Sequence, residues 1–541
     1  MWQHNYTPLY GSLAWSAFGA GFPILVLLVM IAVLRKAAWI SSLAGLAAAA
    51  AVALFINGMP AGIMFSSIAF GAASGLFPIG WVVFTAILLY NITVETGQFE
   101  IVKNSIANLT DDRRLQALLI AFAFGAFIEG AAGFGTPVAV AASMLTGLGF
   151  APFLAGGICL LANTAPVAFG SIATPLITLA STTGLPLLRL SAGVGRICAP
   201  VSLIVPSYLI VVMGGWRALR GVLPAAIACG ATFAGVQFLV SNYIGPELTD
   251  ILASLAAIGV LVVLLRAWKP SDNFKMTGHG EAHPWTHIPR SAALLAWSPF
   301  ALLVVCILFW GMKPVQAQMA HVALKFAWPG LHGLVQKMPP VTAKPVIYDA
   351  FYTLPWLSAS GTACLASAIL SAIVLRVSPG RFLAILGKTA RQLAFAELTI
   401  AVVMALAFLM NYSGSTATLG LAFATTGAMF PFFSALLGWL GVFLTGSDTS
   451  ANALFGNLQV VTAQHLNMNP VLMAASNSSG GVMGKMISLQ SIAVAAAATS
   501  AGGGKEESKL FRFTLKHSIL LASVVGLIVL FYAYPGKVFA P

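Results

Sequence analysis

Three ionisable residues lie deep in apolar sequence, each beside a stretch rich in glycine or hydroxyl groups. Glu129 occurs in FIEGAAGFGTPVAV, Asp448 in GVFLTGSDTSANA and Lys485 in GGVMGKMISLQS. A charge at the centre of a bilayer costs about 2.5–3.5 kcal/mol, so each of these residues requires a partner or a purpose. A buried carboxylate can take up a proton because desolvation favours its neutral form. We therefore expect Glu129, with Asp448 second, to carry a proton and Lys485 to neutralise an anion.

Hydroxyl and amide side chains surround these charges, and they could hold a small carboxylate together with exposed N–H groups at helix ends. The predicted substrate-binding residues are Asn163, Thr164, Ser447, Thr449, Asn477, Ser478 and Lys485. A structural interpretation exists for the charges as well. Asp448 could form a fixed ion pair with Lys485, and Lys485 could instead extend its ammonium group to a membrane interface.

The composition indicates a membrane protein. Of 541 residues, 59% are hydrophobic and 8% are charged, with a mean hydropathy of +0.93, whereas soluble domains carry about 25% charged residues. The apolar runs are about 18–22 residues long, which suits transmembrane helices and not the shorter strands of a barrel. We predict an all-α polytopic membrane protein with about 12–14 transmembrane helices. We expect residues 1–541 to form a single integral membrane domain surrounded by the lipid bilayer.

The net charge of +13 could indicate a nucleic-acid partner, but the basic residues collect in short loops between apolar runs. This pattern is typical of cytoplasmic loops, and we expect no nucleic-acid partner. The loops assigned to the cytoplasm are Lys103–Arg114, Arg217–Arg220, Arg266–Lys275, Arg376–Arg391 and Lys505–Lys516. The N-terminus is then external, because Arg35 and Lys36 follow the first apolar run. Residues 312–349 are predicted to form an external amphipathic excursion.

Two parts of the chain resemble each other at a nearly constant offset. The matched residues are Gly125, Phe127, Gly130, Asn163 and Gly170 in the first part, and Gly441, Phe443, Gly446, Asn477 and Gly484 in the second. A basic loop precedes the first part and an uncharged segment precedes the second, so we predict two inverted repeats, with cores at 78–215 and 392–500. Inverted repeats with broken or re-entrant helices are typical of secondary transporters. Close helix packing is the alternative explanation for any single glycine.

The remaining motifs give no sign of an enzyme. All five cysteines lie in apolar segments without a CxxC pattern, and the chain has no Walker A, HExxH or GxSxG motif. Metal centres and nucleophilic active sites usually leave such signatures. We expect neither catalysis nor a cofactor or metal ion.

Four motifs closely resemble the lactate permease family of bacteria: EGAAGFGTPVA (129–139), NTAPVAFG (163–170), LGWLGVFLTGSDTSANALF (437–455) and GKMISLQSIA (484–493). The resemblance continues in SNYIGPELTDI (241–251) and LFRFTLKHS (510–518), so it covers essentially the whole chain. It implies a permease of the bacterial cytoplasmic (inner) membrane that imports L-lactate, and in relatives D-lactate or glycolate, with protons. Residues 163–164 and 476–478 are also similar to the hairpin tips of dicarboxylate transporters, which implies a substrate-carrying domain that moves against a scaffold.

The sequence leaves alternatives to proton-coupled import of 2-hydroxymonocarboxylates. One is a sodium-coupled carboxylate carrier of the same architecture, although a single deep lysine favours one carboxylate over two. The other is a passive organic-anion channel. A homo-oligomer is compatible with the sequence, and stereospecificity stays open.

Overall fold

The computed structural model describes residues 1–541 except 134, 271, 273, 275–287 and 500–503, and except the side chains of 504, 505 and 539. Within the described residues, 11 helices are long and apolar enough to cross a membrane, or 12 if one bent pair is a single span. The prediction of an all-α polytopic membrane protein is therefore confirmed, and the 11 or 12 helices observed compare with the about 12–14 expected.

The elements up to the middle of the chain are β1 (Trp2–Gln3), α1 (Leu13–Ala32), α2 (Ala38–Ala51), η1 (Val52–Ile56), α3 (Ala61–Ser74), η2 (Gly75–Gly80), α4 (Trp81–Glu95), α5 (Gln98–Ala107), α6 (Arg113–Gln116), η3 (Ala117–Phe124), α7 (Gly125–Ala131), α8 (Thr136–Gly147), α9 (Pro152–Ala162), η4 (Val167–Phe169), α10 (Gly170–Thr183), α11 (Leu187–Tyr243) and α12 (Thr249–Ala267). Those that follow are α13 (Arg290–Gly311), α14 (Lys313–Ala320), β2 (Leu324–Ala327), β3 (Val335–Lys337), β4 (Val346–Ile347), β5 (Phe351–Leu354), α15 (Ser360–Val374), α16 (Pro379–Tyr412), α17 (Ser415–Phe423), η5 (Ala424–Met429), α18 (Phe430–Thr445), α19 (Asp448–His465), α20 (Pro470–Lys485), α21 (Leu489–Ala498), α22 (Gly504–Ala533) and η6 (Lys537–Phe539).

The helix α11 crosses the fold twice. Its 57 residues would extend about 85 Å as a straight helix, whereas a bilayer core is about 30 Å thick. The backbone departs from helical angles at Gly215 and Val222. The two arms lie side by side, since the Ser191 hydroxyl donates to the Ser241 carbonyl at 2.8 Å.

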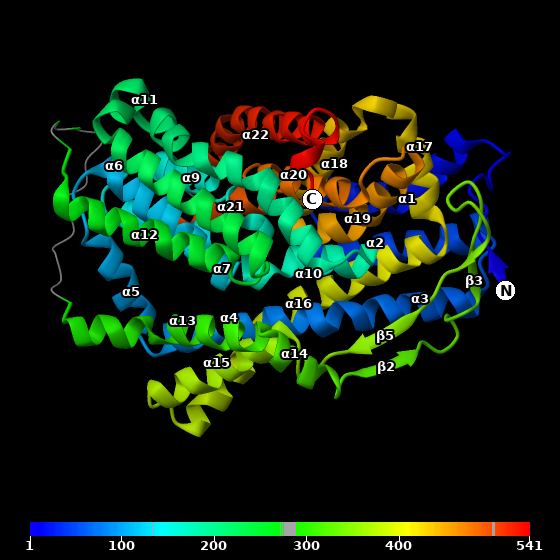
Figure 1. The fold of residues 1–541 in the computed structure, drawn as a ribbon, viewed down its shortest axis with the longest axis horizontal. Coiled ribbons are helices and arrows are strands. Elements are labelled where there is room, and N and C mark those ends of the chain that lie inside the picture. Colours follow the sequence, from blue (N-terminus) through cyan, green and yellow to red (C-terminus); the bar gives the residue numbers. More distant parts are fainter. Residues whose placement is uncertain (134, 271, 273, 275–287, 500–503) are drawn as a thin grey trace.

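The helices form two layers (Figure 1). The layer that we call the α16 layer contains α2, α3, α4, α13, α15 and α16, and the hairpin layer contains α7–α12 and α18–α22. Each layer is held together internally by close glycine contacts. A methyl group on Gly71 of α3 would come within 2.6 Å of the Met404 carbonyl of α16, and one on Gly438 of α18 within 1.9 Å of the Asn477 carbonyl of α20. Such close backbone packing makes each layer a compact unit.

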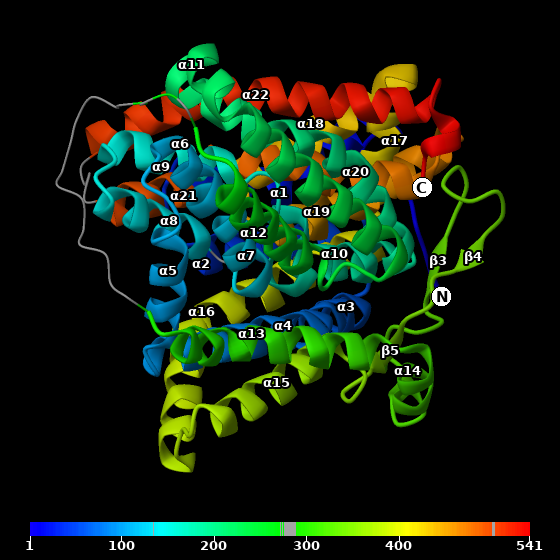
Figure 2. The same ribbon diagram turned by 60° about the vertical axis from the view of Figure 1, so that its left-hand side comes forward.

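The molecule has two chemically different ends (Figure 2). The basic end contains α5, α6 and the bend of α11, and carries Arg113, Arg114 and Arg220. The strand end contains the N-terminus and the strands: β1 pairs in parallel with β3, β3 in antiparallel with β4, and β2 in antiparallel with β5. The segment predicted as an amphipathic excursion supplies α14, which has no buried residue, and β2–β4. Lys275 and the Lys505 side chain lie outside the described residues.

Two helical hairpins enter the hairpin layer from opposite ends. In the first, α7 and α8 flank a break at Ala132–Gly135, and the hairpin opens at the basic end, where the Arg113 guanidinium donates to the Leu148 carbonyl. In the second, α18 and α19 flank a break at Gly446–Ser447. This hairpin opens at the strand end, where His465 shares a cavity with His4 and Met338. The predicted inversion of the two motifs is therefore observed.

Contacts between the hairpins follow the same symmetry. The helix α8 packs against α21, and its counterpart α19 packs against α10, the counterpart of α21. Each hairpin is followed by a second broken pair, α9 with α10 and α20 with α21, and the first of these bends by 66°. This exchange of partners is what a two-fold axis in the membrane plane produces. The boundaries 78–215 and 392–500 for the repeat cores stay a prediction.

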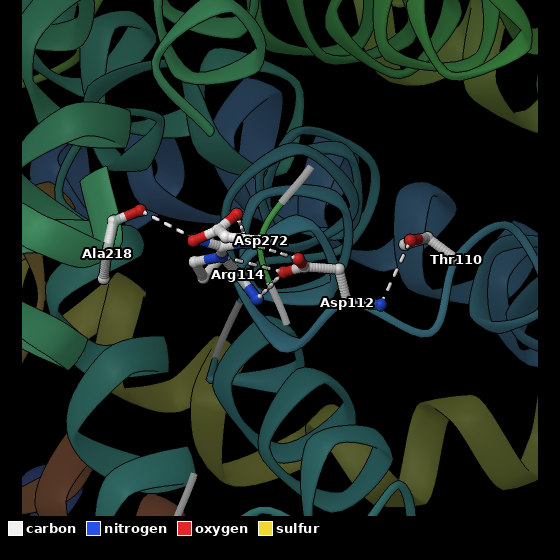
Figure 3. Close-up of polar contacts among 5 residues, drawn as sticks. All are labelled: Thr110, Asp112, Arg114, Ala218 and Asp272. Atoms are coloured by element: carbon white, nitrogen blue, oxygen red, sulfur yellow. Dashed lines mark hydrogen bonds and ion pairs between the residues drawn. The ribbon is translucent and has the colours of Figure 1, made fainter. Parts of the chain in front are cut away.

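A network of charges at the basic end anchors the first hairpin (Figure 3). The buried Arg114 guanidinium donates to both carboxylate oxygens of Asp272 at 2.8 Å, to Asp112 at 2.7 Å and to the Ala218 carbonyl at 3.2 Å. It also lies over the ring of Phe274, 4.9 Å from the centroid. The network joins α6, the bend of α11 and the segment after α12, so it fixes where the first hairpin begins.

Candidate functional site

A cavity of about 180 Å³ lies between the α16 layer and the breaks of the hairpin layer. Its apolar wall comes from α16, with Ile400, Val403 and Met404, and from Ala38 of α2. The same helix α16 adds the hydroxyl of Thr399. The other walls carry ionisable and polar side chains, namely Glu129, Ser171, Thr174, Thr445, Ser447, Asp448, Thr449, Ser450, Lys485 and Gln490. An apolar pocket with a few convergent polar groups is the usual form of a small-molecule site.

Lys485 is the last residue of α20 and reaches across to the second break. Its ammonium group donates to the Gly446 carbonyl at 2.6 Å. That carbonyl is free because Gly446 ends α18 in the left-handed conformation, with φ of +73°, which only glycine adopts readily. Within the described part of the chain, no ion pair joins this ammonium to Glu129 or Asp448. The fixed pair considered from the sequence is absent there, and Lys485 keeps donor capacity for a ligand.

Glu129 lies in the last turns of α7, where it is 5% exposed. Its Oε2 atom is buried without a hydrogen-bond partner in the protein. Gly170, at the start of α10, leaves the space for this carboxylate, since a methyl group there would come within 2.6 Å of Oε1. A buried polar atom without a partner is rare in native proteins and calls for a functional explanation.

Asp448 is more firmly held. It is the first residue of α19, and its Oδ2 accepts from the Ser478 hydroxyl at 2.6 Å and from the Asn452 amide at 3.3 Å. Oδ1 has no partner in the protein. Gly481 of α20 faces this oxygen so closely that a methyl group there would lie 2.4 Å from it. The carboxylate is thus oriented by one oxygen and open at the other.

Helix N-termini also face the cavity. The first turn of α19 lines it, and so does Gln490 in the first turn of α21. Free N–H groups and the helix dipole make such a terminus attractive to anions. Ser447 caps α19 by accepting from the Ser450 amide at 3.2 Å.

The start of α10 has an unusual backbone. Ser171, Ile172 and Ala173 all have left-handed angles, with φ of 49°, 54° and 59°. This conformation costs about 1–2 kcal/mol for each non-glycine residue. Ser171 is fixed there by donating its hydroxyl to the Ala132 carbonyl at 2.9 Å, which ties α10 to the first break. Strained backbone of this kind concentrates at ligand sites, and here it turns Ser171 and Thr174 toward the cavity.

Five of the residues predicted from the sequence line the cavity: Glu129, Ser447, Asp448, Thr449 and Lys485. The other four lie behind its wall. Asn477 is fully buried inside α20, where its side chain binds Ala451, Asn452 and Gln459. Ser478 binds Asp448, Thr164 donates to the Leu161 carbonyl, and Asn163 follows the end of α9 with its amide unpartnered.

The equivalence of Asn163 and Asn477 also fails in the structure. Asn163 stands at a helix break, whereas Asn477 lies well inside α20, which ends at Lys485. In the second repeat the helix is interrupted at 486–488, where α20 and α21 still count as one span. Of the two amides, only Asn163 therefore stands at a sharp break, as the dicarboxylate-transporter likeness implies. The glycine matches hold better, since Gly446 lies at the break of the second hairpin and Gly130 lies in α7, two residues before the break of the first.

Sequence reasoning missed several lining residues. Ser171 and Thr174 follow the NTAPVAFG motif directly, and Gln490 belongs to GKMISLQS, so motif proximity could have indicated them. The α16 wall carries no local signal, because its apolar residues look like any membrane helix. Among the described residues no group of three or more His, Cys, Asp and Glu side chains could hold a metal ion.

Comparisons with known proteins identify the family of this chain. The model of the L-lactate permease family matches residues 16–535. Glycolate permease GlcA of Escherichia coli K12 is 44% identical, with 98% of each chain covered. The L-lactate permease of Bacillus subtilis 168 is 45% identical, with 97% of each chain covered, and that of E. coli K12 is 42% identical, covering 99% of this chain and 98% of that one. A solved structure, the YdaH transporter of Alcanivorax borkumensis, aligns with a TM-score of 0.45 and 14% identity over 87% of this chain and 88% of that chain. The family match and the full-length relatives show that this chain belongs to the L-lactate permease family.

Proposed function

We propose that the protein is a secondary active transporter that imports L-lactate, D-lactate and glycolate together with protons across the bacterial cytoplasmic membrane. The observation that carries the proposal is the cavity at the two inverted breaks, where one ammonium and two carboxylates with unpartnered oxygens converge. Relatives at 42–45% identity are named L-lactate permeases and a glycolate permease, and these names support the substrate class.

The substrate carboxylate would bind between Lys485 and the N-terminus of α19. One ammonium and one helix terminus suit one carboxylate, and the hydroxyls of Ser447 and Thr449 are close enough in the lining to receive the 2-hydroxyl group. We assign Asn163, Thr164, Asn477 and Ser478 to the support of this site, since their side chains lie behind the lining. Ser478 acts by orienting Asp448.

Glu129 would carry the coupled proton. Its unpartnered Oε2 can be protonated without breaking a hydrogen bond, whereas protonation of Asp448 competes with Ser478 and Asn452. Proton binding would neutralise Glu129 and leave Lys485 free to hold the substrate anion. Asp448 is therefore the second candidate.

The transport movement would be a displacement of the hairpin layer against the α16 layer. Each layer is tightly packed internally, and the cavity lies between them. The positive-inside rule orients the basic end to the cytoplasm and the N-terminus to the outside.

Labelled L-lactate uptake into proteoliposomes tests the proposal, with an inward proton gradient and an inward sodium gradient imposed in turn. We expect accumulation above the external concentration with the proton gradient alone. Accumulation driven only by sodium would show that sodium, and not the proton, is the coupled ion. Equilibration without accumulation under both gradients would indicate a passive pathway.

A further inference from the structure

Another buried carboxylate, Asp250, lies where α12 packs against α7, beside Glu129. It occupies the first turn of α12, in the acidic SNYIGPELTD segment, and is 1% exposed. It approaches α7 at Gly130, the residue after Glu129. A methyl group on Gly130 would come within 2.8 Å of the Asp250 Cβ atom, so glycine at this position is what allows α12 to approach α7 so closely next to Glu129.

The Asp250 carboxylate has no hydrogen-bond partner for either oxygen in the protein. An ionised carboxylate in this environment is strongly disfavoured unless it is paired. The titratable groups that interact with it are Glu129 of α7 and the thiol of Cys198 of α11. Arg196 of α11 donates instead to Asn242 and to the Ala540 carbonyl. Glu247, which precedes α12, lines a different cavity with Gln316.

The two carboxylates differ in what they face. Glu129 lines the transport cavity and interacts with Lys485, whereas Asp250 lies on the far side, between α7, α11 and α12. Asn163 lies next to Glu129, is 4% exposed, and has an amide without a partner. The region around Glu129 therefore holds several polar atoms that the protein itself does not satisfy, in keeping with groups that exchange protons.

We propose that Glu129 and Asp250 are electrostatically coupled carboxylates, so that Asp250 is a positioning residue that sets how readily Glu129 takes up the transported proton. Two neighbouring carboxylates in a low-dielectric environment do not both ionise readily, so a negative charge on one makes the other bind a proton more readily. This inference rests on the proposed role of Glu129 in proton coupling.

The first test is the pH dependence of L-lactate accumulation in proteoliposomes made with the wild type, Asp250→Asn and Glu247→Gln. Removing the negative neighbour should shift the pH of half-maximal accumulation to lower pH by about one unit, a tenfold change in proton concentration. Lactate exchange without a gradient should persist, which separates a coupling defect from a folding defect. Glu247→Gln is the matched control, a half-buried acid of the same segment, and should follow the wild type.

If the wild type accumulates lactate with protons and Asp250→Asn shows the same pH dependence, the proposed coupling of Glu129 and Asp250 is wrong. A wild type that does not accumulate lactate with protons refutes the proposed function itself, so the two failures are distinct. If Asp250→Asn does not fold, the infrared carboxyl bands of the wild type and Glu129→Gln provide a second measurement. The Asp250 band should titrate at lower pH in Glu129→Gln, and an unchanged titration overturns the proposed coupling.

Discussion

The Arg114 network and the transport cavity both bury charged groups, but these groups differ in how many partners they have within the protein. Arg114 directs its guanidinium at two carboxylates, a carbonyl and an aromatic ring, so its donors have partners within the protein (Figure 3). Glu129 and Asp448 each retain an oxygen without a partner, and the Lys485 ammonium donates to one carbonyl, that of Gly446. A satisfied charge fixes geometry, whereas an incompletely satisfied charge is available to a ligand or a proton. The comparison therefore distinguishes a structural anchor, the Arg114 network, from a site that can bind a ligand or a proton, the cavity, which we call the working site.

The largest effect is expected at the working site. Replacing Glu129 with Gln should abolish uphill L-lactate accumulation, because the amide keeps the shape of the side chain but cannot carry a proton. Exchange of labelled for unlabelled lactate should continue, and the thermal unfolding midpoint should change little. Accumulation against a gradient by this variant would remove Glu129 from the coupling mechanism.

The anchor should respond in stability instead. Replacing Arg114 with Gln removes charge-assisted hydrogen bonds to Asp112 and to the half-exposed Asp272, and we expect a loss of about 1.5–3 kcal/mol of unfolding free energy. Thermal unfolding in detergent measures this loss. Exposed Arg217, at the bend of α11, provides the control, and Arg217→Gln should unfold like the wild type. A stable Arg114→Gln variant with reduced lactate affinity would contradict the assignment of Arg114 to a purely structural role.

Lys485→Gln sharpens the comparison within the cavity. A charge-assisted hydrogen bond contributes about 1.5–3 kcal/mol, so we expect the KM for L-lactate to rise about 10–100-fold. The exposed Lys516 offers a matched change of charge, and Lys516→Gln should leave KM unaltered. An unchanged KM in Lys485→Gln would assign this lysine to the support of Gly446 alone.

The smallest effect concerns acid stability at the basic end. The Arg114 guanidinium, which donates to Asp272, holds the pKa of that carboxyl below its usual range. The folded pKa is depressed, so the stabilisation is present above the unfolded value near 3.9 and is lost as pH falls through the folded value. We expect Asp272→Asn to be less stable than the wild type at neutral pH, with the difference shrinking on acidification below about pH 4. Unfolding curves measured across this pH range would detect a difference that fails to shrink.

Much of the architecture could be predicted from the sequence. Long apolar runs require membrane helices, and glycine clusters beside Glu129 and Asp448 require broken helices that line a cavity. The basic loop before the first motif and the uncharged segment before the second indicated the inversion, which the Arg113–Leu148 contact and the position of His465 bear out. The cost of burying a charge singled out Glu129, Asp448 and Lys485 before any geometry was known.

The sequence by itself therefore determined that the protein lies in a lipid bilayer, that it contains two repeats and which ionisable residues belong to the site. Hydropathy, helix breaking and the cost of burying a charge all act locally along the chain. Only the tertiary structure decided which polar side chains face the cavity. Asn477 and Ser171 are equally polar and equally buried, yet one binds neighbouring helices and the other lines the site. Only the packing of α12 against Gly130 brings Asp250 beside Glu129. A helix buried on every side has no polar face to reveal its orientation, so its rotation depends on contacts with distant segments.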